Sequence, residues 1–552
     1  MKTVVLCDSS EFVSYQRFEN SVLNVLDFYQ ILFQPIDISY TLVDAVELDD
    51  VGLMIIAQET TAKKLSSSDW RLIFKQVSAG MGLVIFDGMV SSYQELISPY
   101  IGIPEFKIEK TDEIVLEESW INSIAASKKI RTKIPLLLNT PSELDSIWNV
   151  FLRDHRFNPV GMWRKYGKGK IAIISISQGI WHKSCLGHTN GFDSVLWRTL
   201  VFTARKPFIF KAVPPFVLCR INDASGLPEI DSPAKNFGYV SVLNRADFIP
   251  HIGLCIRDIK QNSISDIREL YYQSKAEFSA HSFTKKEENR DPSIYLGSDG
   301  KEFSFEKLNS HFREIENFFC KLNIAPARTI NAHRSQIGYN SIAFFKNHNQ
   351  SFAMNLLKPG KTFSDGRSLS WEPKPFGVQN FCIDYLDENQ AIFNAAFHPG
   401  QITNTGADID FLNGSSERSS AISAAERGIF QIKRGLENLT CGCLMFHERN
   451  LEKLIFAEFE AVVGIINAEI RKHPHIYKPY DYVTSYLKNR MDSKIVRVQQ
   501  KNAHIQVILS GKSIMPQFMY CFFDDGENTI QNFLEIPPFE KSVELSYKIP
   551  KP

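Results

Sequence analysis

The stretch Phe216-Val-Leu-Cys-Arg-Ile-Asn-Asp-Ala-Ser-Gly226 decides the fold of the central part of this chain. An apolar run ends in polar residues and a glycine, which is the pattern of a buried strand that runs into a turn. Similar runs follow at 253–257, 276–279, 351–355 and 443–446, with amphipathic stretches between them. Strands that alternate with helices predict a parallel α/β arrangement.

Polar residues follow these strands at the points where they end. Asn222-Asp223 follows the first, His281 the third and His447-Glu448 the last, while Asn331-Ala-His333-Arg334 follows a helical stretch. The carboxyl ends of parallel strands in an α/β barrel meet on one face, where ligand sites collect. We therefore expect these side chains to lie close together.

The series resembles the polysaccharide-deacetylase family of metal-dependent carbohydrate esterases. Arg220-Ile-Asn222-Asp223 stands where that family has Thr-Phe-Asp-Asp-Gly, whose first Asp is the catalytic base and whose second binds the metal. His281-Ser-Phe-Thr-Lys285 matches the first half of the family's His-x-x-x-His element, and His447 matches its late His, which protonates the leaving group. The resemblance implies an irregular, partly open β/α barrel over residues 212–490.

Two positions depart from the family's pattern. Asn222 occupies the place of the catalytic base, although an amide cannot accept a proton near neutral pH. Lys285 occupies the place of the second imidazole, and a protonated amine cannot ligate a cation. A catalytic zinc site normally has three protein ligands, so His333 is the predicted third ligand beside Asp223 and His281. The predicted cofactor is a divalent metal ion, most simply zinc.

The remaining site predictions complete this picture. The predicted catalytic positions are His447, as the general acid, and Asn222, and the predicted substrate-binding residues are Arg220 and Arg334. Structural roles for the same residues remain open. Asp223 could make a turn with Ser225-Gly226, and His447-Glu448 could cap the helix that follows.

Residues 1–207 form a separate predicted domain. Apolar runs at 4–6, 52–57 and 82–86 read as strands of a flavodoxin-like parallel sheet, with a helix at 67–78. The closing pattern around residues 193–208 resembles the end of class I glutamine-amidotransferase-like domains. In active members a Cys nucleophile follows a central strand, but Asp87-Gly88-Met89 offers no thiol here. We expect a docking or lid module without amidotransferase chemistry.

The last predicted domain spans residues 491–552, where apolar and polar residues alternate as in a small antiparallel β-sandwich. Cys521-Phe-Phe-Asp-Asp-Gly526 imitates the deacetylase opening motif, but too little chain follows it to complete a barrel. We interpret it as a hairpin. His473-Pro-His475 is interpreted as a loop that ends a helix rather than as a metal chelator. The fold class is therefore a multidomain α/β protein with these three parts.

Composition restricts the partners of the chain. The 552 residues include 62 basic and 62 acidic side chains, so the formal net charge is zero. Proteins that bind nucleic acid usually carry a clustered excess of positive charge, so this composition does not indicate a nucleic-acid scaffold. No stretch approaches the roughly 20 apolar residues that cross a bilayer, and the N-terminal apolar run is too short for a signal peptide. Nine scattered cysteines read as reduced thiols. We expect a cytoplasmic location, and the oligomeric state stays open.

Two functions of different classes follow. The first is a metal-dependent hydrolase that removes an acyl group from an N- or O-acylated carbohydrate. The second is a catalytically silent carbohydrate-binding or assembly protein that keeps the deacetylase barrel. Asn222 and Lys285 favour the second function, whereas Asp223, His281, His333 and His447 together favour the first.

Overall fold

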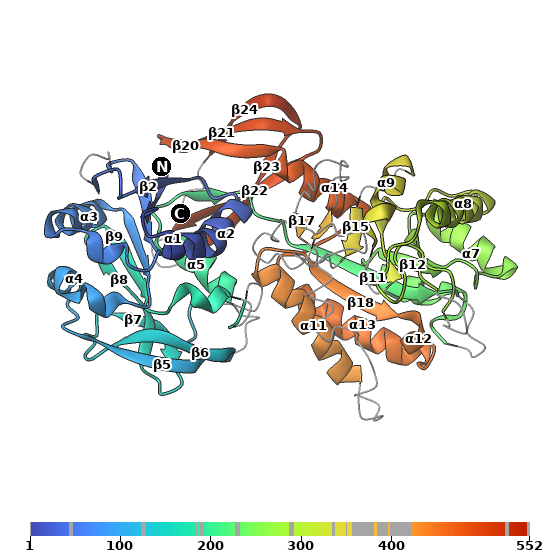
Figure 1. Ribbon diagram of the computed structural model, residues 1–552, viewed down its shortest axis with the longest axis horizontal. Helices are drawn as coiled ribbons and strands as arrows, with labels where there is room; N and C mark the ends of the chain where they lie inside the picture. Colours follow the sequence, from blue (N-terminus) through green and yellow to red (C-terminus); the bar gives the residue numbers. More distant parts are fainter. Residues whose placement is uncertain are drawn as a thin grey trace. The chain divides into compact units, whose positions relative to one another are not determined.

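The computed structural model describes residues 2–43, 48–122, 129–182, 185–187, 192–226, 232–285, 292–333, 337–348, 350, 352–355, 380–382, 396–397, 421–524 and 529–548. The chain forms two compact units (Figure 1). Unit 1 combines Met1–Ala212 with Asn489–Pro552, and unit 2 is Val213–Lys488.

A nine-stranded sheet forms the centre of unit 1, in the order β2-β1-β3-β4-β9-β8-β7-β5-β6. The first five strands run parallel to their neighbours and the others antiparallel. The predicted strands at 4–6, 52–57 and 82–86 lie in its parallel half and are almost entirely buried, as strands covered on both faces are. The strands are β1 (Lys2–Cys7), β2 (Phe33–Asp37), β3 (Val51–Ile56), β4 (Gly82–Phe86), β5 (Phe106–Leu116), β6 (Lys129–Pro141), β7 (Asn149–Asp154), β8 (Pro159–Tyr166) and β9 (Gly169–Ile174).

The helices of unit 1 begin where the sequence offers a start signal or an amphipathic run. The predicted helix at 67–78 is α3, whose first turn is closed by a capping box between Ser66 and Asp69. The helices are α1 (Phe12–Phe18), α2 (Asn24–Phe28), α3 (Ser67–Ala79), α4 (Gln94–Ile101) and α5 (Phe192–Thr203).

Two three-stranded antiparallel sheets complete unit 1. One is β20 (Ser493–Lys501), β21 (His504–Ser513) and β24 (Phe539–Lys548), and the other is β10 (Phe208–Phe210), β22 (Gln517–Asp524) and β23 (Thr529–Ile536). They share one core, in which Ile209 packs with residues such as Val507 and Cys521. Residues 491–552, predicted as a domain of their own, lie in unit 1, because β10 precedes unit 2 in the chain and pairs with β22.

A parallel sheet in the order β13-β12-β11-β18 organises unit 2. Its strands are β11 (Phe216–Ala224), β12 (Pro250–Cys255), β13 (Glu277–Ser282) and β18 (Gly442–His447), and β19 (Ile476–Tyr477) pairs with the start of β11. A second sheet has the order β14 (Thr329–Ile330), β15 (Phe352–Asn355), β16 (Asn380–Cys382) and β17 (Ala396–Phe397).

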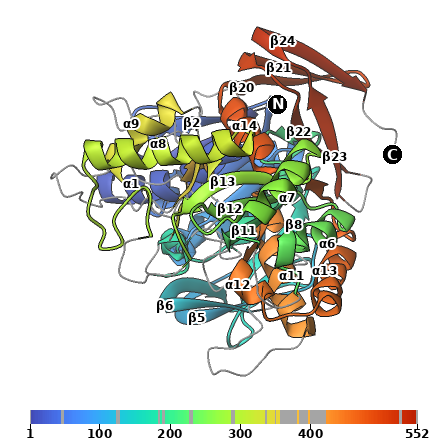
Figure 2. The same ribbon diagram turned by 90° about the vertical axis from the view of Figure 1, so that its right-hand side faces the viewer.

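The helices of unit 2 flank these sheets, and α8 lies beside α9 in both views (Figures 1 and 2). Phe312 of α8 stacks on Phe344 of α9, with ring centroids 5.1 Å apart. The helices are α6 (Tyr239–Arg245), α7 (Gln261–Tyr272), α8 (Phe305–Leu322), α9 (Tyr339–Asn347), α11 (Ala421–Glu437), α12 (Glu448–Leu451), α13 (Phe456–Ile470) and α14 (Tyr480–Met491), the last of which runs on into unit 1.

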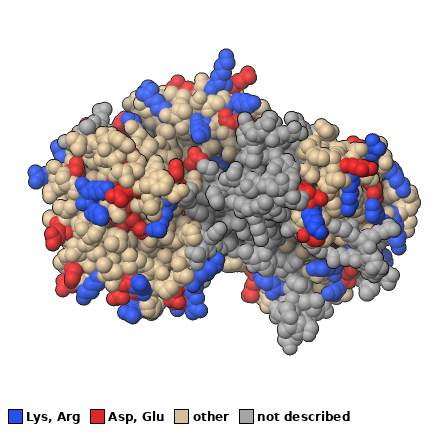
Figure 3. Space-filling model, in the orientation of Figure 1, with Lys and Arg blue, Asp and Glu red and all other residues tan. Residues whose placement is uncertain are grey.

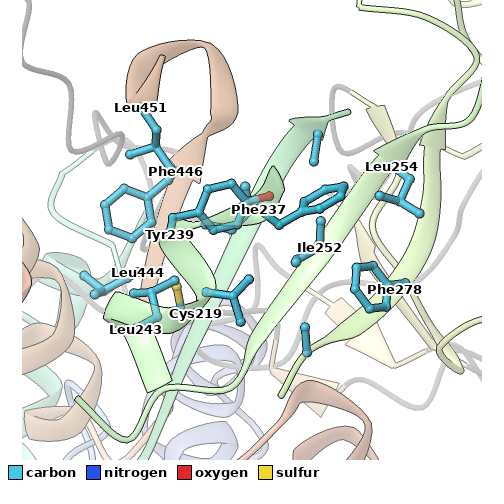
Figure 4. Close-up of a cluster of buried hydrophobic side chains, with 14 of the residues drawn as sticks. Cys219, Phe237, Tyr239, Leu243, Ile252, Leu254, Phe278, Leu444, Phe446 and Leu451 are labelled. Atoms are coloured by element: carbon cyan, nitrogen blue, oxygen red, sulfur yellow. The ribbon is translucent and has the colours of Figure 1, made fainter. Parts of the chain in front are cut away.

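The two faces of the β13-β12-β11-β18 sheet differ in chemistry. Successive side chains of a strand point to opposite faces. One face belongs to a hydrophobic cluster that includes Cys219, Ile252, Phe278, Leu444 and Phe446, packed against residues of α6 and α12 (Figure 4). The alternate residues carry the polar groups, namely Arg220, Asn222, His251, Ser279, His281 and His447. The apolar face anchors the sheet, and the other face carries the candidate site.

On the face seen in Figure 3, acidic and basic side chains are interspersed over the described surface. Among the described helices, none is long and apolar enough to cross a membrane. Free thiols are found at Cys7, Cys185, Cys219, Cys255, Cys320, Cys443 and Cys521. The structure agrees with the interpretation of two short motifs as part of a hairpin and as a loop at the end of a helix. Cys521 lies in β22, which pairs antiparallel with β23, and His473-Pro-His475 follows α13.

Candidate active site

The carboxyl ends of three strands in unit 2 bring the predicted residues together. His281 Nε2, at the end of β13, lies 3.1 Å from Asp223 Oδ1 of β11. His447 Nε2, at the end of β18, lies 4.0 Å from the other carboxylate oxygen of Asp223 and 3.5 Å from Asn222 Nδ2. The ring of His333, just beyond β14, meets that of His281 edge to face, with centroids 5.4 Å apart.

A bulge in β11 explains how neighbouring residues both reach this site. The pairing with β12 shifts register between Ile221 and Ala224, and Asp223 has a φ of 53°. In a regular strand Asn222 and Asp223 would point to opposite faces. The extra residue and the left-handed conformation, which Asp tolerates better than most residues, turn both side chains toward His447.

A hydrogen bond from behind sets the orientation of His281. Its Nδ1 lies 2.6 Å from the carbonyl oxygen of Asn331, so Nδ1 carries the hydrogen that the carbonyl accepts. This leaves Nε2 facing Asp223 Oδ1, which is itself an acceptor. A short contact between these two atoms requires a proton or a metal cation, and metal-binding histidines are commonly held in this way.

The charge state of Asp223 follows from competing effects. Burial raises the pKa of its carboxyl, but the hydrogen bond to His281 and the electrostatic effects of the neighbouring His281, His447 and His333 outweigh that effect. The pKa is therefore held well below its usual value. Asp223 is a carboxylate at any pH near neutral, as a metal ligand must be.

Two further residues shape the site and were not predicted. The side-chain amide of Asn331 donates to Asn222 Oδ1 over 2.9 Å, so Asn331 orients both Asn222 and His281. Gly253 of β12 makes room for this arrangement, because a Cβ there would lie 2.8 Å from Asn331 Nδ2 and 3.0 Å from His281. The sequence shows both residues at strand ends, but it does not show that they touch the same histidine.

The structure describes Arg220, one of the two predicted substrate-binding arginines, but not the other. Arg220 is 1% exposed, on the same face of β11 as Asn222 but deeper, and its guanidinium donates to Met445 Sδ over 2.8 Å. Arg334 lies outside the described residues. The role of both in substrate binding stays a prediction.

Lys285, which stands in place of the family's second imidazole, does not face Asp223. Its ammonium donates to Glu448 over 2.6 Å and to Glu452 over 2.8 Å. Glu448 is fully buried in the first turn of α12, whose N-cap position is His447 as predicted, but no side-chain hydrogen bond caps that helix. Its carboxylate instead accepts hydrogen bonds from the backbone after β11.

The donor types fit a zinc-like ion, since a carboxylate and imidazoles are its common ligands. Asp223 and His281 would hold such an ion, and His333 is the predicted third ligand. Within the described part of the chain, no three His, Cys, Asp or Glu side chains are gathered closely enough to hold an ion together. The metal therefore stays a proposal.

The sequence predicts no nucleophile in the turn that follows β4 of unit 1. Asp87 occupies the turn, and its Oδ1 accepts a hydrogen bond from the backbone of Met89 over 2.8 Å. Cys185 is buried, and burial raises the pKa of its thiol. An activated thiol needs the opposite shift. The resemblance of this part to amidotransferase-like domains stays a prediction.

Comparison with known proteins supports the fold. No family model and no curated protein matches the chain. A crystal structure of Agd3, described as a novel carbohydrate deacetylase, is similar over 99% of this chain and 98% of its own, with a TM-score of 0.54 and 10% identity. A cytoplasmic protein from Salmonella typhimurium LT2 covers 37% of this chain and 100% of its own, with 13% identity and a TM-score of 0.26. At these identities the similarity concerns the fold.

Proposed function

We propose that the site around Asp223, His281, His333 and His447 removes an acyl group from an N- or O-acylated carbohydrate with the help of a bound divalent metal ion, most simply zinc. The observation that carries the proposal is that His281 and His447 both approach Asp223 at the carboxyl ends of the strands, with the ring of His333 against that of His281. The similarity in fold to a carbohydrate deacetylase, which extends over almost the whole chain, adds support.

Each residue has a distinct part in this proposal. When bound, the ion would supply Lewis-acid polarisation of the acyl carbonyl. Asp223, kept ionised by the surrounding histidines, and His281, oriented by the Asn331 carbonyl, would hold it together with His333. His447, which lies near the carboxylate oxygen of Asp223 that His281 does not contact, would give a proton to the departing nitrogen or oxygen.

Asn222 favours the second candidate function, in which the chain binds a carbohydrate without turnover. Its side-chain oxygen accepts from Asn331 and its nitrogen faces His447, so the residue is held as a neutral amide. It cannot take the proton that the base takes in the resembled family. Under this alternative the same site would bind the acylated sugar and release no acid.

Metal analysis and acetate release separate the two functions. The hydrolase proposal expects purified full-length protein to retain a divalent ion and to release acetate from N-acetylglucosamine oligomers or O-acetylated sugars. His447→Ala should then lower turnover by roughly 10²–10⁴-fold, which is the usual contribution of a general acid, without loss of metal. His475→Ala, in the loop after α13, is the matched control and should retain turnover.

The other outcomes are equally informative. Sugar binding without acetate release would support the binding function instead. Turnover that is unchanged in His447→Ala would remove this residue from the mechanism, and protein with neither metal nor turnover would end the hydrolase proposal.

A further inference from the structure

Glu448 is a buried acid next to the site that the proposed mechanism does not use. It is 0% exposed and directly follows His447 in the chain. Its carboxylate accepts from the backbone N–H groups of Ser225, over 2.7 Å, and Gly226, over 3.1 Å. The hydroxyl of Tyr239 adds a third donor over 3.3 Å, and the ammonium of Lys285 a fourth over 2.6 Å.

These donors connect three strand ends of the sheet. Ser225 and Gly226 follow Asp223 by two and three residues, and Lys285 lies three residues beyond the end of β13. One carboxylate thus ties the backbone after Asp223 to the residue after His447. Charge-assisted hydrogen bonds to a buried carboxylate are stronger than neutral ones, so this connection is stiff.

The backbone that Glu448 holds has an unusual path. Asp223 and Gly226 both have positive φ, of 53° and 69°. A Cβ at Gly226 would lie 2.5 Å from the ring of Phe237, so this position has no room for a side chain. Strained backbone persists where its surroundings hold it in place, and such strain collects at functional sites.

Lys285 has a role in the same arrangement. A buried carboxylate is costly unless a positive charge and hydrogen bonds compensate it. The ammonium of Lys285 supplies that charge, while its own backbone N–H donates to Asp258. The side chain that stands in place of a second imidazole therefore serves Glu448 rather than a metal.

We infer that Glu448, neutralised by Lys285, is a positioning residue that sets the geometry between Asp223 and His447. The turnover measurement that tests this inference rests on the proposed function, because it requires the protein to release an acyl group. The inference adds two residues to the site that touch neither substrate nor metal but fix the groups that would.

A matched pair of double variants tests this inference. In Lys285→Met with Glu448→Gln, both charges are gone, but the amide oxygen can still accept from Ser225 and Gly226. In Lys285→Met with Glu448→Met, the charges and the acceptor are both gone. The two proteins thus differ in the side-chain amide at position 448 alone, and neither carries an uncompensated buried charge there.

We expect the Gln variant to retain most of the acetate-releasing turnover, and the Met variant to lose about 10–100-fold in kcat with KM little changed, as supporting residues around metal sites typically cost when removed. Zinc affinity, measured with the metal alone, should fall in parallel. Measurements are made well below the Tm of each variant. Equal kcat in the two variants, with only a lower Tm for the Met variant, would overturn the inference and leave Glu448 a structural residue.

A second measurement, which does not depend on turnover, distinguishes failure of this inference from failure of the proposed function. If the wild type shows no hydrolysis, the proposed function fails on its own. The coupling between Asp223→Asn and His447→Gln, measured as non-additive shifts in Tm, should persist in the Gln background and vanish in the Met background. Coupling of the same size in both would overturn the positioning role whether or not the protein is an enzyme.

Discussion

Asp87 in unit 1 shows how one buried side chain can control the pH dependence of stability. It follows β4, is 1% exposed, and has a pKa raised to about 7 by burial, with the nearby charge of Glu59 adding to the effect. The ordinary value is 3.8. The folded state therefore keeps a proton that the unfolded chain releases above about pH 4, so stability falls as pH rises from there through 7.

Asp87→Asn should remove this dependence. The amide keeps an oxygen for the Met89 N–H and never has to ionise in the core. A pKa difference of about three units corresponds to roughly 4 kcal/mol at most, so we expect a gain of a few kcal/mol at pH 8 and almost none at pH 4. Urea unfolding at both pH values measures it. A gain of equal size at both pH values would contradict the assignment.

For single residues, the sequence predicted which side chains lie together but not the backbone geometry that brings them together. Asp223, His281 and His447 could be placed together because parallel strands end at one edge. The bulge that turns Asn222 and Asp223 to the same side has no sequence signal, since it depends on the pairing with β12. Nor could the partner of Lys285 be predicted, because Glu448 lies 163 positions further along the chain.

At the scale of the secondary-structure elements, β12 makes room for the site because its Gly253 has no side chain. Gly253→Ala would place a methyl group against Asn331 and His281 in a packed interior. We expect a loss of about 1–3 kcal/mol in the free energy of unfolding, together with reduced turnover because His281 must shift.

Gly464→Ala on α13 is the matched control. A Cβ there meets nothing within 4 Å, so the change should stabilise the helix by up to about 1 kcal/mol. Thermal unfolding of the two variants checks both signs. A Gly253→Ala protein as stable as the wild type would show that the site has room that the structure does not indicate.

The strands of both units were predicted well where apolar runs are short and bounded by turn residues, as in β4 and β18. The prediction separated 491–552 from the N-terminal part because alternation in sequence reports local structure only. The pairing of β10 with β22 joins residues more than 300 positions apart, and the sequence carries no local signal for it.

At the scale of the whole molecule, unit 1 depends on both ends of the chain. Phe210 stacks on Tyr520 and Phe522, with centroids 5.5 Å from each, and the buried Nζ of Lys211 donates to the carbonyl and the hydroxyl of Ser493. A chain that ends at Met491 loses all of these contacts. The hydrophobic cluster of unit 2 lies wholly within residues 217–477 and is kept.

We therefore expect this truncation to destabilise unit 1 and spare unit 2. Hydrogen exchange should become faster in β1, β3 and β4, while β11 and β12 remain protected. The full-length protein is the control. Unchanged protection in β1 and β3 would show that the nine-stranded sheet is stable without the C-terminal strands.

The discontinuity of unit 1 has a consequence for synthesis on the ribosome. Strands 20 to 24 emerge last, so β10 must wait for β22 while the whole of unit 2 is translated. At about 5–20 residues per second, this wait lasts on the order of tens of seconds. Unit 2 can bury its own core during that time, whereas the apolar side chains of β10 and of its neighbours remain uncovered. The nascent chain thus passes through a period in which the apolar side chains of β10 are open to aggregation while unit 2 folds.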